Sequence, residues 1–124
     1  MQIILTPQES EEFFLSALCN GLGYISGHGL ALDYEKAHYN KAKESLRLGA
    51  CYEDVLMQIL RQGDALTLVD EESGDFADIT LDMVHSRMGN VPITHLMNMI
   101  NEDDDAETAD VIIQWVAYQE VIFG

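Results

Sequence analysis

The residues of this chain that could do chemistry are its four histidines, its two cysteines and its 22 carboxylates. The two cysteines, Cys19 and Cys51, lack the CxxC spacing of a metal half-site or of a redox motif. No histidine pair has the HExxH or HxxxH spacing that would place two zinc ligands on one face of a helix. The histidines are His28, His38, His85 and His95. Because no motif supports metal binding or nucleophilic catalysis, we expect a protein without a cofactor and without enzymatic activity.

The surroundings of the cysteines predict their state. Cys19 and Cys51 both stand beside apolar positions of expected helices, so we expect buried free thiols. Free thiols are typical of a reducing compartment, which favours a cytoplasmic protein.

Residues 101–110 are rich in carboxylates, which are typical ligands of calcium. Asp103 and Asp105 match two ligand positions of an EF-hand loop, but Ala106 and Ile112 replace its glycine and its final glutamate. The segment is therefore not an EF-hand, although an adventitious calcium site on these carboxylates stays open.

Glycines at positions 21, 23, 27 and 29 resemble a phosphate-binding loop in number only. A dinucleotide-binding loop follows a strand and opens a helix, whereas these glycines follow an expected helix and have no lysine nearby. We expect the end of a helix and a turn here. A pocket lined by Tyr24, His28 and Tyr34 is the alternative.

Charge is distributed unevenly along the chain. Of the net charge of −16, residues 1–61 carry −3 and residues 62–124 carry −13, with Arg87 as the only base in the second part. The total exceeds the magnitude of about 2 to 8 that solubility alone favours. Nucleic acids and anionic membranes are disfavoured as direct partners, because binding them relies on lysine and arginine. No apolar run reaches the roughly 18 residues of a membrane span, so we do not expect a membrane protein.

Two acidic runs, within residues 70–78 and 102–110, hold eleven of the 22 acids. Duplex DNA carries one phosphate charge per about 1.7 Å of its axis, and proteins that read it carry matching basic tracks. An acidic surface could occupy such a track, and complementary charge would speed the encounter. In composition the chain resembles small, very acidic proteins that phages and mobile elements encode to disarm host nucleases. The expected contact residues, provided that both runs share one face, are Asp70, Glu71, Glu72, Asp75, Glu102, Asp103, Asp104 and Asp105.

We therefore expect a non-enzymatic interaction protein that engages a basic, nucleic-acid-binding protein partner. A second hypothesis is a homo-oligomeric structural or accessory protein whose acidic loops only keep it soluble, because residues 93–123 are rich in apolar side chains. A third is a domain that binds a small ligand or a divalent metal around Tyr24, His28 and the carboxylates. Solvated loops remain the simplest explanation of both acidic runs.

Apolar periodicity predicts a mainly helical α+β fold in a single domain over residues 1–124. Thr6 and Glu9 predict a capping box at the start of the first helix, Gly21 and Gly23 predict its end, and Asp33 predicts the cap of the second. Thr80 or Asp82 is expected to cap the fourth. We expect helices at 7–21, 34–48, 51–61, 82–88, 92–101 and 105–118, a β-hairpin at 66–81, and short strands at 1–5, within 23–32 and at 121–123.

The order of these elements over residues 7–81 is compatible with a winged-helix-like arrangement. Such DNA-binding folds commonly place a recognition helix in the major groove. Here the third helix carries Glu53 and Asp54, so we do not expect direct DNA binding through it.

Overall fold

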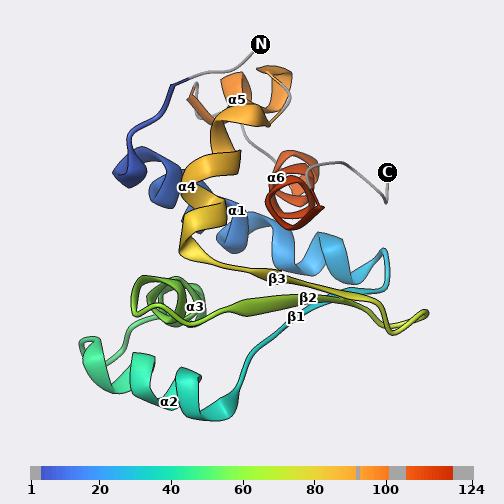
Figure 1. Ribbon diagram of the computed structural model, residues 1–124. Helices are drawn as coiled ribbons and strands as arrows, with labels where there is room; N and C mark the ends of the chain where they lie inside the picture. The colour runs from blue at the N-terminus through green and yellow to red at the C-terminus, as the bar shows by residue number, and fades with distance from the viewer. Residues whose placement is uncertain (1–3, 92, 101–105, 119–124) are drawn as a thin grey trace.

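The computed structural model describes residues 4–91, 93–100 and 106–118 (Figure 1). Its helices are α1 (Pro7–Ser26), α2 (Lys36–Ser45), α3 (Tyr52–Arg61), α4 (Leu81–Arg87), the short 3₁₀ helix η1 (Met88–Asn90), α5 (Ile93–Ile100) and α6 (Ala106–Tyr118). Its strands are β1 (Leu30–Asp33), β2 (Leu66–Asp70) and β3 (Phe76–Ile79). The predicted mainly helical α+β fold is confirmed.

The predicted hairpin is present as β2 and β3, and β1 extends it to a three-stranded antiparallel sheet in the order β1-β2-β3. Successive side chains of a strand point to opposite faces. Leu30, Leu66, Leu68 and Ile79 lie buried on the face towards α1 and α6, whereas α2 lies on the other side of the sheet (Figure 1). The outer face is therefore free to carry polar residues.

Helix α1 is longer than predicted, because Gly21 does not end it. The helix continues to Ser26, and Gly21 lies inside it against α6. A Cβ atom at this position would stand 2.9 Å from the Cβ of Ala109 and 3.1 Å from Cδ1 of Ile113. The glycine thus permits a close approach of two helices, and the predicted stop was wrong.

Helix α2 is shorter than predicted at both ends. Asp33 belongs to β1 and accepts a hydrogen bond from the Tyr34 amide at 2.9 Å, so it is not the helix cap. Glu35 takes the cap position without a side-chain hydrogen bond. At the other end the helix stops at Ser45, and residues 46–50 form a loop in which Gly49 has a φ of 87°.

Three helix ends are stabilised by side chains. Thr6 and Glu9 form the predicted capping box, with hydrogen bonds of 3.0 and 3.1 Å between each side chain and the other residue's amide. The Thr80 hydroxyl, rather than Asp82, caps α4 by accepting from the Met83 amide at 3.4 Å. Arg87 donates to the carbonyl oxygens of residues 116 and 117, in the last turn of α6, where a positive charge favours the helix dipole.

Other sequence predictions have mixed outcomes. Residues 4 and 5 form no strand, and residues 1–3 and 121–123 lie outside the described residues. Cys19 and Cys51 are free but exposed, so the prediction of buried thiols was wrong. Cys19 falls on the α1 face away from the buried Phe14 and Leu18, and Cys51 precedes α3 at its cap position.

An ion cluster joins α1, α3 and α4. The Glu11 carboxylate lies 2.9 Å from Nε of Arg61 and 2.9 Å from Nε2 of His85. Burial by itself would raise the pKa of Glu11, but the hydrogen bonds and charges of Arg61 and His85 lower it overall. The ionised form of Glu11 therefore stabilises the packing of three helices.

Gly21→Ala should lower the free energy of unfolding, by up to about 2 kcal/mol. The higher helix propensity of alanine is worth about 1 kcal/mol, whereas overpacking costs typically about 1–3 kcal/mol. Urea denaturation measures the difference, and Gly21→Ala/Ala109→Gly should recover part of it. A stabilised Gly21→Ala variant would show that the helices are not in close contact here.

Glu11→Gln should lower the free energy of unfolding by about 1 kcal/mol at neutral pH, because a charged acceptor is lost. Since folding lowers the pKa of Glu11, its contribution is present above the ordinary value of 4.5 and is lost as the pH falls through the lowered value. The difference from the wild type should therefore shrink below about pH 4.5 in a pH series of denaturation curves. Glu12→Gln, on the exposed side of α1, is the matched control and should show no such difference.

Candidate functional site

The β2–β3 turn positions the first acidic run. Asp70 ends β2, the amide of Gly74 donates to the Asp70 carbonyl at 2.8 Å, and Gly74 has a φ of 79°, which glycine adopts readily. The Asp70 carboxylate accepts hydrogen bonds of 3.0 Å from the Glu72 amide and from the Ser73 hydroxyl. Asp70 is half-buried, and its carboxylate stabilises the turn through these hydrogen bonds.

The other predicted residues of this run are exposed. Glu71, Glu72 and Asp75 project from the turn, and within the described part of the chain no lysine or arginine forms an ion pair with them. Their negative charges are therefore not neutralised by the fold. We call Glu71, Glu72, Asp75 and the adjoining Phe76 the hairpin tip.

Phe76 gives the hairpin tip an apolar element that the sequence analysis missed. Its side chain is 68% exposed at the start of β3, opposite Val69 in the sheet register. Phe76 stands on the outer face of the sheet because its neighbour Ala77 lies opposite the buried Leu68. An exposed aromatic ring beside three carboxylates is a typical contact residue for a protein partner.

Acids continue from the hairpin tip along the outer face of the sheet. Asp78 and Asp33 are exposed and stand opposite Thr67 from its two sides, which places them two strand spacings, about 10 Å, apart. Asp78 accepts a hydrogen bond of 2.9 Å from the Thr67 hydroxyl. Together with Glu35 they line a hollow of about 280 Å³ between α2 and the sheet. The alternation of strand residues could have predicted this row once the register was known.

The end of α6 lies close to the hairpin acids. Burial, and then the negative charges of Asp70 and Asp75, raise the pKa of Tyr118 above 10.0. The hairpin field therefore reaches the last described turn of α6.

The second acidic run has a different outcome. Glu102, Asp103, Asp104 and Asp105 lie outside the described residues, so their place on one face with the hairpin stays a prediction. Asp110 is not a surface acid: it is 2% exposed, accepts a hydrogen bond of 3.0 Å from Nε2 of Gln114 and lies 3.5 Å from Nε2 of His28.

The alternative pocket of Tyr24, His28 and Tyr34 stays a prediction, although contacts of two of its residues are described. His28 contacts Asp110, while Tyr34 stacks on Tyr39 with ring centroids 5.0 Å apart and accepts a hydrogen bond of 3.1 Å from the Tyr52 hydroxyl. The side chain of Tyr24 lies outside the described residues. Burial, followed by the hydrogen bond to Tyr34, raises the pKa of Tyr52, which makes it a poor general base at neutral pH.

Neither thiol is activated. Burial and nearby negative charge, of Glu53 first, raise the pKa of Cys19. A backbone hydrogen bond at Asp54 lowers the pKa of Cys51, but the hydrogen bond of 3.1 Å from its Sγ to the Asp54 carboxylate and the surrounding acids raise it overall. A reactive cysteine requires the opposite shift.

Among the described residues, no group of three or more histidine, cysteine, aspartate or glutamate side chains could hold a metal ion. Within the same ranges, no helix combines the length and the apolar character needed to cross a bilayer.

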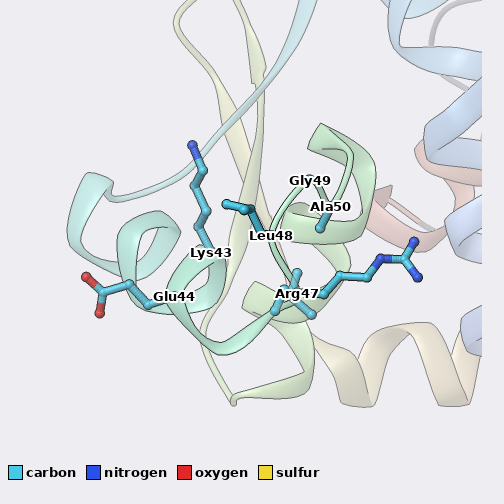
Figure 2. Close-up of a pocket in the computed structure, with 7 residues that line it drawn as sticks. Lys43, Glu44, Arg47, Leu48, Gly49 and Ala50 are labelled. Atoms are coloured by element: carbon cyan, nitrogen blue, oxygen red, sulfur yellow. The ribbon is translucent and has the colours of Figure 1, made fainter.

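The positive charge gathers elsewhere, on α2 and the loop that follows it. Lys36, Lys41, Lys43 and Arg47 lie within twelve positions of each other. The loop residue Leu48 is fully exposed beside a hollow of about 500 Å³ (Figure 2). This exposed loop was not predicted, because the expected helix extended to residue 48.

Comparisons of the chain with protein-family models, with curated proteins and with solved structures found no match. The predicted order of elements over residues 7–81 is present, and the winged-helix-like arrangement itself stays a prediction.

Replacing Asp70 and Asp75 by asparagine should lower the pKa of Tyr118, because two negative charges near the phenol are removed. The pKa should stay above 10.0, since burial is the larger cause. A spectrophotometric titration, with Tyr118→Phe as the reference that isolates this tyrosine, measures the change. Asp78→Asn is the matched control, and an equal shift in that variant would show that the effect is not local.

Proposed function

We propose that this protein is a non-enzymatic interaction protein that engages a basic, nucleic-acid-binding protein through the acidic surface of its hairpin. One observation carries the proposal: the exposed carboxylates of Glu71, Glu72 and Asp75 have no lysine or arginine partner among the described residues. Unpaired like charges destabilise a compact state through mutual repulsion, so their concentration on one turn has a cost. Binding to a cationic surface removes that cost.

The surroundings of the hairpin support the same partner chemistry. Asp78 and Asp33 extend the row of carboxylates along the sheet, and Phe76 adds an aromatic contact. A basic surface that binds the phosphates of duplex DNA offers cations at regular spacing together with apolar contacts between them. An acidic surface supported by a sheet would compete with DNA for such a site, in the manner of a nucleic-acid mimic.

The four unplaced carboxylates of the second run would enlarge this surface if they lie on the same side. Glu102–Asp105 therefore remain proposed contact residues together with the hairpin tip. Asp70 acts indirectly in this proposal, because its carboxylate holds the turn that presents its neighbours.

Glu71→Lys/Glu72→Lys should abolish capture of basic proteins from a host-cell lysate by the immobilised chain. Capture by the wild type should fall steeply with salt, because charge attraction between exposed groups is screened. Duplex DNA added as a competitor should release the captured proteins, since it occupies the same basic site. Bound fractions are measured by quantitative mass spectrometry along a salt gradient.

Glu12→Lys/Asp82→Lys is the matched control, because it changes the net charge equally at exposed acids outside the hairpin. It should keep most of the capture. Equal loss in both variants would assign the binding to net charge alone, and capture that DNA does not displace would contradict the mimicry.

A further inference from the structure

The cations of this chain divide into two groups. Arg61 pairs with Glu11 at 2.9 Å, and Arg87 donates to a carbonyl oxygen at the end of α6 at 2.7 Å. The remaining four form no ion pair or side-chain hydrogen bond with the described residues. They are Lys36, Lys41, Lys43 and Arg47, all on α2 or directly after it. The unpaired positive charge is therefore confined to one part of the surface.

The loop after α2 combines this charge with an apolar group. Figure 2 shows Lys43 and Arg47 extending to either side of Leu48, while Glu44 is directed away from it. Leu48 is fully exposed, and the hollow that these residues line measures about 500 Å³. We call Lys43, Arg47, Leu48 and Gly49 the basic loop. Its chemistry suits a segment that carries carboxylates and an exposed apolar ring.

The hairpin tip is a segment with that chemistry. Glu71, Glu72 and Asp75 supply carboxylates, and Phe76 supplies an aromatic ring that is 68% exposed. In Figure 1 the hairpin tip and the loop between α2 and α3 lie at opposite ends of the molecule. The two complementary surfaces cannot meet within one chain, but they can meet between two copies.

We propose that the basic loop of one copy receives the hairpin tip of a second copy, which produces head-to-tail self-association. The contact is heterologous, so every open oligomer keeps one free hairpin tip and one free basic loop at its ends and can grow into a longer chain or close into a ring. Because it covers the hairpin tip, self-association competes with binding of the basic partner. This inference uses the same hairpin surface as the proposed function, but each can fail without the other.

The salt dependence of the contact follows from the net charge of −16. At about 0.01 M salt the screening length is about 30 Å, so whole molecules repel each other. At about 0.15 M it is about 8 Å, which suppresses this repulsion while the close charge pairs still attract. At about 1 M it is about 3 Å, and the attraction is screened as well. Self-association should therefore be strongest at intermediate salt, whereas capture of a basic partner should weaken steadily.

Sedimentation velocity of the full chain over this salt range, at up to about 1 mM protein, tests the proposal, because a contact smaller than about 1,200 Å² is transient. A loop variant, Lys43→Gln/Arg47→Gln/Leu48→Ser, and a hairpin variant, Glu71→Gln/Glu72→Gln/Phe76→Thr, should each weaken self-association roughly tenfold or more. All six substituted side chains are exposed, and none of them belongs to the hydrophobic core. Lys36→Gln/Lys41→Gln, which removes equal charge outside the hollow, should keep most of it.

Mixing the two variants provides the decisive test. The loop variant retains a hairpin tip and the hairpin variant retains a basic loop, so an equimolar mixture should form a dimer that cannot grow. A wild type that stays at 13.9 kDa under all conditions, an assembly that survives both variants, or a mixture that stays monomeric would overturn the proposal.

Capture of basic proteins separates this inference from the proposed function. The loop variant should capture them at least as well as the wild type, because its hairpin tip is no longer covered. If the loop variant loses self-association but no form of the chain captures a basic protein, the proposed function fails and the self-association stands.

Discussion

The close approach of α1 and α6 at Gly21 is the contact on which the rest of the structure depends. Its two helices are far apart in sequence, and most other elements pack on one or both of them: α3, α4 and β1 on α1, and α4, α5 and β3 on α6. With a larger residue at position 21 the backbones of α1 and α6 would move apart. The buried side chains between the two helices would then lose van der Waals contacts. Dense packing of this layer keeps the sheet in a defined place.

The fixed position of the sheet keeps two parts of the surface apart. Its strands run between the loop after α2 at one end of the molecule and the β2–β3 turn at the other, so groups at these two ends are held apart (Figure 1). The unpaired cations gather near one end, and the unpaired carboxylates of the hairpin tip lie at the other. The hairpin tip and the basic loop of one copy therefore cannot neutralise each other, and both surfaces stay available to other molecules.

Several of the described groups that could support catalysis make structural contacts. Glu11, Arg61 and His85 join three helices, and Asp110 is buried against Gln114. Tyr34, Tyr39 and Tyr52 pack on each other. The cysteine and tyrosine pKa values that shift move upward, which disfavours the reactive anions. Recognition of a partner by charge therefore remains our proposal for this protein.

The sequence by itself determined the local elements: the capping box of Thr6 and Glu9, the helix α3 and the β2–β3 hairpin depend on neighbours within a few positions, and each was predicted. It also determined how much charge the chain carries and in which runs. Only the tertiary structure decided that Gly21 continues a helix, that β1 joins the hairpin, that Asp110 is buried and that Leu48 is exposed. Each of these outcomes depends on a partner distant in sequence or on the space that other elements leave. Short-range sequence propensity carries no information about either.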